Sequence, residues 1–332
     1  METRVYGRTG MHISILGFGC GAVGGLMVRG AAADQEKAIG EALDAGINYF
    51  DTAVQYGNGA SETNLGRTFK VLKPAGVFVG TKVRLPATDF GRIAEAVTES
   101  LDGSLARLQM DHVDIFHLHN AISENGGGDT LSADQVLDEV VPALEALRDA
   151  GKTRFLGITA VGETEALLRV IDAQKFDSAQ VSYNMLNPSA GEAPPPGYPA
   201  QDYDRMFDHT LEAGVGVVGI RVLAGGALSG SEQRHPIASP PPEPIGTASS
   251  YAADLERARR LMPLVTEGFA ASLPEAAVRF AITHPAMGTI LVGMATVDEF
   301  EGALAAVQKG PLPPPALARL AALRERFSGE SR

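Results

Sequence analysis

Four polar residues lie where their side chains could act together: Asp51, Tyr56, Lys82 and His119. Three of them end successive predicted strands, and Tyr56 follows shortly after the first. Because the carboxyl ends of parallel strands meet at one mouth of a barrel, these side chains are expected to converge. Taken singly, each has a plainer explanation, as a strand-end cap, a loop anchor, a surface charge and a hydrogen-bonded core histidine, respectively. Taken together, a protonated phenol beside an ammonium, a carboxylate and an imidazole predicts proton-transfer chemistry.

The elements that must position these residues alternate along the chain. Short β-branched runs are followed by longer stretches whose apolar residues recur at helical spacing. The predicted strands cover residues 13–19, 47–51, 77–82, 113–119, 154–159, 178–182, 215–221 and 289–293. The clearest predicted helices cover residues 34–45, 61–70, 91–108, 133–150 and 163–173. Ala-Gly steps at 45–46, 150–151 and 213–214 each close a helix just before a strand, where glycine can adopt the left-handed cap conformation.

The eight predicted strands favour a (β/α)8 TIM barrel over an open doubly wound sheet. An open sheet that binds a dinucleotide carries a G-x-G-x-x-G loop between its first strand and the next helix. Gly19, Gly21 and Gly24 match that spacing, but residues 28–33 intervene before a good helix begins. We therefore expect an α/β protein with one barrel domain over residues 1–332.

Composition and charge limit the possible partners and the compartment. Hydrophobic residues make up 45% of the chain and charged residues 20%, and the formal net charge of −12 argues against nucleic acid or a membrane surface as a partner. Cys20 is the only cysteine and the first residues do not resemble a leader peptide, so the cytoplasm is the expected compartment. No apolar stretch reaches the ~18 residues of a membrane span.

Two proline-rich tracts, at residues 194–199 and 240–244, follow the sixth and seventh predicted strands. In a barrel they would belong to the face that carries active sites, where such loops shape the substrate pocket. Rigid exposed surface loops are the alternative explanation.

Several motifs resemble the signatures of the aldo-keto reductase superfamily, in its bacterial, aldose-dehydrogenase-like branch. They read NYFDTAVQYG at 48–57, SE at 61–62, LG at 65–66, TKV at 81–83 and VDIFHLH at 113–119. The resemblance runs from RVYGRTG at 4–10, which looks like the N-terminal β-hairpin of that family, to ILVGM at 290–294. It implies a TIM barrel with this hairpin and a C-terminal helix, and hydride transfer between a nicotinamide cofactor and a carbonyl or alcohol substrate.

The resemblance also implies a role for each of the four polar residues. Tyr56 would be the general acid or base, Lys82 would lower its pKa, and Asp51 would keep the ammonium charged and oriented. His119 would hydrogen-bond the substrate oxygen. Since side chains alternate along a strand, His117 shares the face of His119 and is expected to point into the barrel in a structural role. No metal site is expected.

The family resemblance further implies residues that bind the cofactor. Thr159, where serine is more usual, and Gln180 would hold the nicotinamide carboxamide, while Ala160 stands where asparagine is common. Ile220 replaces an aromatic residue that stacks on the nicotinamide. Arg221, in place of a serine, and Leu223 fall in the segment that clasps the pyrophosphate. Arg221 could pair with a phosphate or, alternatively, with a neighbouring acid.

The start of the last helix of the barrel would meet the adenosine end of the cofactor, through Gly293, Thr296 and Glu299. Relatives that prefer NADP carry Lys or Arg there, whereas this chain has Ala295 and Glu299, with Ala303 in place of an asparagine that meets the adenine. A 2′-phosphate beside Glu299 would be repelled. We therefore expect NAD(H), unless a base folds over the site from Arg257, Arg259 or Arg260.

Two other functions are compatible with parts of the pattern. One is a non-catalytic, nicotinamide-binding regulatory subunit on the same barrel, although such a protein would not need the four polar residues. The other is a metal-dependent barrel enzyme, for which His117 and His119 alone give too few ligands. The expected substrate is a small aldehyde, ketone or sugar, or the corresponding alcohol.

Overall fold

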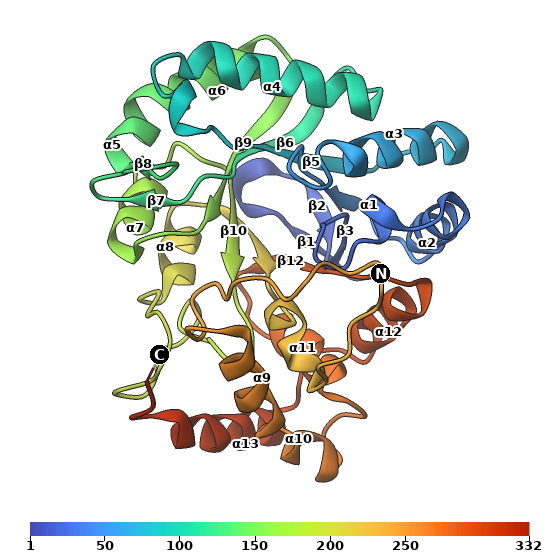
Figure 1. Ribbon diagram of the computed structural model, residues 1–332, viewed down its shortest axis with the longest axis vertical. Helices are drawn as coiled ribbons and strands as arrows, with labels where there is room; N and C mark the ends of the chain where they lie inside the picture. Colours follow the sequence, from blue (N-terminus) through green and yellow to red (C-terminus); the bar gives the residue numbers. More distant parts are fainter. Residues whose placement is uncertain (332) are drawn as a thin grey trace.

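The computed structural model describes residues 1–331, and eight parallel strands close into a barrel that helices surround (Figure 1). In order around the ring, the strands are β3 (Leu16–Gly19), β4 (Tyr49–Asp51), β5 (Phe78–Val83), β6 (Val113–Leu118), β9 (Thr153–Ala160), β10 (Ser178–Ser182), β11 (Gly216–Ile220) and β12 (Met287–Val292). β12 pairs with β3, which excludes an open doubly wound sheet. The predicted TIM barrel is confirmed.

The predicted first strand at residues 13–19 is wrong as one element, because the chain changes sheets within it. β2 (His12–Ser14) pairs antiparallel with β1 (Thr3–Val5), whereas β3 belongs to the barrel. The Ser14 hydroxyl donates to the carbonyl of Leu16 where the two strands separate. The β1–β2 hairpin is the one that the family resemblance implied, and it covers the amino-terminal end of the barrel.

Helices connect the strands and cover the outside of the barrel. They are α1 (Leu26–Arg29), α2 (Ala32–Asp44), α3 (Ala60–Leu72), α4 (Ile93–Leu108), α5 (Ala133–Gln135), α6 (Val141–Asp149), α7 (Thr164–Asp172), α8 (Met206–Glu212), α9 (Tyr251–Arg259), α10 (Pro263–Thr266), α11 (Leu273–Ala281), α12 (Val297–Gln308) and α13 (Pro314–Arg324). The helix predicted over 133–150 is interrupted by a π-helical turn, Val136–Val140, just before Pro142, which has no N–H to donate.

Glycine closes three of the helices as the sequence predicts. Gly46, Gly151 and Gly214 have φ angles of 80°, 73° and 66°, in the left-handed region that glycine adopts without steric cost. Each follows a helix and directs the chain toward the next strand.

Apolar and aromatic side chains fill the interior of the barrel at its amino-terminal end. Tyr6, from the hairpin, is fully buried with Tyr49, Ile115 and Val218. Its hydroxyl bonds the hydroxyl of Ser178, which also contacts His117 Nε2 at 2.9 Å. His117 therefore points into the barrel as predicted, so the barrel is a packed core that is closed at this end.

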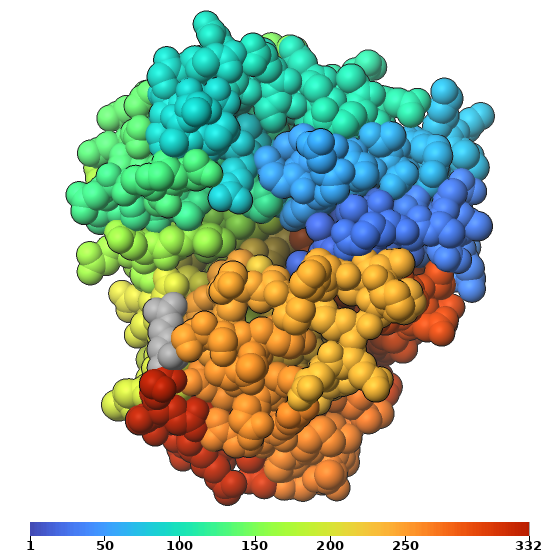
Figure 2. Space-filling model, in the orientation of Figure 1, coloured from blue at the N-terminus to red at the C-terminus, as the bar shows by residue number. Residues whose placement is uncertain are grey.

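Long loops form the opposite end, at the carboxyl ends of the strands. Both proline-rich tracts lie there, after β10 and β11. The gold-to-orange segment that precedes α9 extends from β11 toward the loop after β3 (Figures 1 and 2). Ser239 N–H donates to the Val23 carbonyl, and Arg29 donates to the Ile237 carbonyl. This segment therefore bridges two sides of the barrel mouth.

Within residues 1–331, no helix is long and apolar enough to cross a membrane.

Candidate active site

The carboxyl ends of the barrel strands surround a cavity of about 870 Å³. Residues from β3, β4, β9, β10, β11 and β12 line it, together with Tyr56 and His119 from the loops that follow β4 and β6. The volume falls within the range of pockets that hold small molecules and cofactors. The segments that the sequence predicted to converge thus meet at one cavity.

Lys82 lies at the centre of the polar cluster and contacts two of the other three predicted residues. Its Nζ is 2.5 Å from Asp51 Oδ1 and 3.1 Å from the Tyr56 hydroxyl, and it also donates to the Thr52 carbonyl at 2.8 Å. The Lys82 side chain is fully buried and Asp51 is 3% exposed. A buried ammonium is stable only with such compensation, so the ion pair fixes the position of Nζ beside the phenol.

The second carboxylate oxygen of Asp51 is held by two further donors. Gln180 Nε2 donates to Oδ2 at 2.6 Å and the Tyr49 hydroxyl donates to it at 3.1 Å. Gln180 was expected to serve the cofactor only, and Tyr49 was not predicted at all. Tyr49 precedes Asp51 by two residues on β4, so strand alternation could have revealed it.

The pKa of the Tyr56 phenol results from two opposing effects. Burial raises it, Lys82 lowers it, and the net pKa lies above the ordinary value. For Lys82, burial alone would lower the pKa, but Asp51 and Tyr56 together outweigh burial and the net pKa is raised. At neutral pH the site therefore holds a protonated phenol beside a charged ammonium. Lys82 does favour the phenolate, as expected, but it does not bring the pKa of Tyr56 below its usual value.

The ring of His119 is in edge-to-face contact with the ring of Tyr56, at 6.0 Å between ring centroids. Burial, then Lys82 and Arg84, lower the pKa of His119 to about 3. The imidazole is thus neutral at physiological pH and has one N–H. Its Nδ1 lies 3.5 Å from Gln55 Oε1, so the tautomer that is protonated on Nε2 is the one that can donate to an oxygen in the cavity.

Thr159 and Gln180 lie side by side on paired strands and both line the cavity. The Thr159 hydroxyl is buried without a hydrogen-bond partner among residues 1–331. Because Gln180 uses its NH2 group on Asp51, its carbonyl oxygen remains as an acceptor. A free donor beside a free acceptor fits a primary amide such as the nicotinamide carboxamide.

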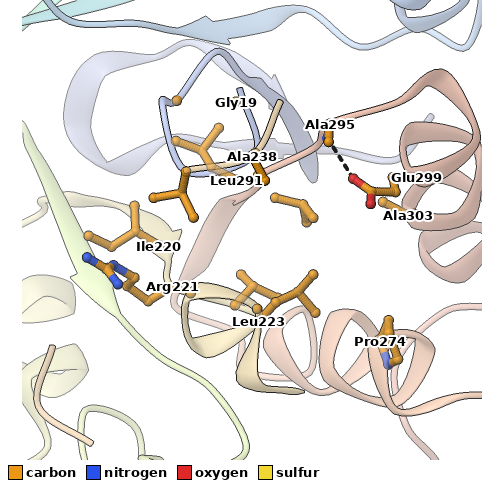
Figure 3. Close-up of a pocket in the computed structure, with 18 of the residues that line it drawn as sticks. Gly19, Ile220, Arg221, Leu223, Ala238, Pro274, Leu291, Ala295, Glu299 and Ala303 are labelled. Atoms are coloured by element: carbon orange, nitrogen blue, oxygen red, sulfur yellow. Dashed lines mark hydrogen bonds between the residues drawn. The ribbon is translucent and has the colours of Figure 1, made fainter. Parts of the chain in front are cut away.

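Arg221 follows β11 and lines the cavity on the same side as Ile220 and Leu223 (Figure 3). Its Nη1 donates to the Glu243 carbonyl at 3.1 Å, and within residues 1–331 no carboxylate forms an ion pair with it. Burial lowers the pKa of its guanidinium. The alternative pairing with a neighbouring acid is therefore not observed in this part of the chain.

The opposite end of the cavity is formed by α11 and α12, where Glu299 and Ala303 lie (Figure 3). Glu299 Oε2 accepts from the Ala295 N–H at 2.6 Å, drawn as the dashed line. Gly293 also lines the cavity, whereas Thr296 caps α12 by accepting from the Glu299 N–H and does not appear in the lining.

Three arginines could supply a positive charge at this end of the cavity, namely Arg257, Arg259 and Arg260, but their side chains point elsewhere. Arg257 and Arg260 form ion pairs with Glu330, and Arg259 pairs with Glu232. None of them lines the cavity. Lys309 does line it, but its Nζ is 2.7 Å from Glu275.

Arg84 is a lining residue that the sequence analysis missed. It follows Lys82 by two residues, so alternation places it on the same face, one step nearer the mouth. Among residues 1–331, no group of three His, Cys, Asp or Glu side chains is placed to hold a metal ion.

Comparisons with known proteins agree with this geometry. The family model described as "Aldo/keto reductase family" matches residues 15–325. L-galactose dehydrogenase from Arabidopsis thaliana is 30% identical over 311 residues, which cover 92% of this chain and 88% of that protein. A probable voltage-gated potassium channel subunit beta from rice is 24% identical and covers 94% of this chain and 93% of its own length. A solved aldo-keto reductase from Bacillus halodurans, in its holo form, has a TM-score of 0.70 at 24% identity, covering 100% of this chain and 97% of its own.

Proposed function

Because this chain belongs to the aldo/keto reductase family, we propose that it transfers hydride between a nicotinamide cofactor and a carbonyl or alcohol, with Tyr56 as general acid and base. The observation that carries the proposal is the contact of Lys82 Nζ with both Asp51 and Tyr56 at the wall of the cavity. A protein that only bound a ligand would not need a buried ammonium aimed at a phenol.

In this proposal, the chain's own residues manage the proton and the substrate oxygen. Tyr56, protonated at neutral pH, donates its proton to the oxygen of a carbonyl that is being reduced, and accepts one from an alcohol in the reverse direction. Lys82 stabilises the negative charge that develops on the phenol oxygen. The neutral imidazole of His119 donates a hydrogen bond that orients the substrate oxygen.

The cofactor would supply the hydride, and the residues that line the cavity fit it from end to end. The Thr159 hydroxyl and the Gln180 carbonyl suit the carboxamide, and Arg221 and Leu223 suit the pyrophosphate. Gly293 and Glu299 lie at the adenosine end, and Thr296 supports that end by capping α12.

We further propose a preference for NAD(H). The carboxylate of Glu299 lines the adenosine end, and Lys309 is neutralised there by Glu275. None of Arg257, Arg259 and Arg260 lines the cavity. A 2′-phosphate would therefore face the Glu299 carboxylate, while Lys309, the lysine that lines this end in the described chain, is already paired.

A second candidate is a nicotinamide-binding regulatory subunit, which the resemblance to a potassium channel subunit beta favours. A substrate panel separates the two. The protein is incubated with NADH or NADPH and aldehydes, ketones and sugars, and with NAD or NADP and alcohols and aldoses, while nicotinamide absorbance is followed. Turnover that is lost in Tyr56→Phe supports the enzyme, whereas tight cofactor binding without turnover of any compound supports the regulatory subunit.

A further inference from the structure

The charges around the cavity are unevenly distributed. Four Lys or Arg side chains from residues 1–331 line it, namely Arg84, Arg221, Arg234 and Lys309. Lys309 is paired with Glu275 at the adenosine end. Arg234 is tied to the carbonyls of Gly225 and Ser239. Arg221 is assigned above to the cofactor, which leaves the role of Arg84 open.

Arg84 lies at the reacting end of the cavity, next to the polar cluster of Asp51, Tyr56, Lys82 and His119. In the barrel, Lys82 pairs with His117 and Val83 pairs with Leu118, so the next step brings Arg84 beside His119. The backbone N–H of His119 donates to the Val83 carbonyl, and this hydrogen bond holds the two segments together at that point. A substrate whose oxygen meets Tyr56 and His119 therefore lies close enough to Arg84 for a second polar group to reach it.

β5 and β11 lie on opposite sides of the ring, because three strands separate them in either direction. Arg84 thus belongs to the wall that faces Arg221 across the mouth. A cofactor held along β11 and β12 leaves the β5 side to the substrate.

The charge of Arg84 is not neutralised by a tight partner. Its ion pair is with Asp129 at 3.9 Å, and the two side chains are 54% and 52% exposed. Asp129 Oδ1 accepts from the Ala87 N–H at 3.0 Å, so this carboxylate already serves the loop. Exposed pairs of this kind contribute at most about 1 kcal/mol, so a ligand carboxylate can displace Asp129.

The acidic side chains that line the cavity do not oppose an anionic ligand at this end. Asp51 is compensated by Lys82 at 2.5 Å. The other two in the described chain, Glu275 and Glu299, belong to α11 and α12 at the adenosine end. Although the whole chain carries a formal charge of −12, the side chains that line the reacting end in the described chain include no uncompensated carboxylate.

We propose that Arg84 binds a carboxylate group of the substrate, so that this enzyme prefers carbonyl or alcohol substrates that carry a carboxylate away from the reacting carbon. The inference rests on the proposed oxidoreductase function. One guanidinium offers the single positive charge and the parallel N–H groups that a carboxylate accepts. At neutral pH such substrates are anions, so the guanidinium of Arg84 attracts their carboxylate at short range.

The test compares each acid with a neutral compound of similar size and shape. 4-Carboxybenzaldehyde and 4-carbamoylbenzaldehyde have the same shape, and D-galacturonate and D-galactose form a second pair among sugars. We expect kcat/KM to be about tenfold or more higher for the acid of each pair, mostly through KM, and the ratio to fall as salt is added. In Arg84→Gln the acid-to-neutral ratio falls to about one, and Arg84→Lys restores part of it.

Arg148→Gln is the matched control, because it removes the same charge from the outside of the barrel on α6, where Arg148 pairs with Glu145. It should keep the wild-type ratio. The proposal is overturned if wild-type enzyme turns over the acid and the neutral compound equally, or if Arg84→Gln keeps the preference. Should no compound of any kind be turned over with either cofactor, it is the oxidoreductase function that fails, and the proposal with it.

Discussion

The buried ion pair of Lys82 and Asp51 predicts a large loss of stability when only one partner is removed. Lys82→Met leaves the Asp51 carboxylate, 3% exposed, without its cation. Breaking a buried pair in this way costs about 3–5 kcal/mol of the free energy of unfolding, out of a typical total of about 5–15 kcal/mol. Activity disappears as well, because Nζ no longer faces Tyr56.

The double variant Asp51→Asn/Lys82→Met separates charge from lost contacts. The Thr52 carbonyl loses its donor in both the single and the double variant, so that cost cancels. The double variant has no buried charge left unpaired, and it should recover at least half of the stability that Lys82→Met loses, yet it should remain inactive.

Urea unfolding followed by circular dichroism measures these differences. The control is a pair with the same residue types and the same 2.5 Å separation, Lys152 and Asp102, whose side chains are 33% and 51% exposed. Lys152→Met should change the free energy of unfolding by less than about 1 kcal/mol. If Lys82→Met were as stable as the double variant, the argument that the two buried charges compensate one another would be wrong.

Three further predictions concern the proton donor, the cofactor and pH. Tyr56→Phe should abolish turnover while NADH affinity, measured by fluorescence titration, stays within about twofold, since only the proton source is removed; substantial remaining turnover would refute the assigned role. Glu299→Arg should raise kcat/KM for NADPH relative to NADH, and an unchanged ratio would contradict the placement of the 2′ position at α12. Burial, Lys82 and Arg84 lower the pKa of His119 from 6.5 to about 3. As the pH drops below 6.5, His119 therefore binds a proton in the unfolded chain but stays neutral in the folded chain. Stability therefore falls as the pH drops below that value, and in His119→Gln the fall measured by urea unfolding should be smaller by up to about 2 kcal/mol at pH 5; equal pH dependence in both proteins would show that His119 is not held neutral by the fold.

Strand alternation explains how much of the site the sequence could predict. Asp51, Lys82 and His119 lie at the ends of three neighbouring strands, at one mouth of the barrel, as predicted from the order of the strands alone. The same rule applied two residues before Asp51 and two residues after Lys82 would have added Tyr49 and Arg84. Both were within reach of the sequence, because side chains two residues apart on a strand share a face.

Other features depend on packing that no local pattern encodes. The β2–β3 break looks continuous in sequence because apolar residues run through it, and only the hairpin's position under the barrel separates the two strands. The contact of Arg29 with the Ile237 carbonyl joins residues 208 apart in the chain. The ion pairs of Arg257, Arg260 and Arg259 outside the cavity likewise join residues 73, 70 and 27 apart in the chain.

The bond from Gln180 to Asp51 links the two halves of the proposed active site. β4 and β10 lie opposite one another in the ring, so this bond spans the barrel interior beneath the cavity. A donor that hydrogen-bonds the Gln180 carbonyl polarises the Gln180 amide, and this strengthens the hydrogen bond from its NH2 group to Asp51. Asp51 then interacts more strongly with Gln180 and less strongly with Lys82. Lys82 can in turn act more fully on the Tyr56 phenol, whose pKa it lowers against the effect of burial. We therefore expect occupation of the proposed amide site and the acidity of Tyr56 to be coupled through Asp51, which accepts from Gln180 and pairs with Lys82.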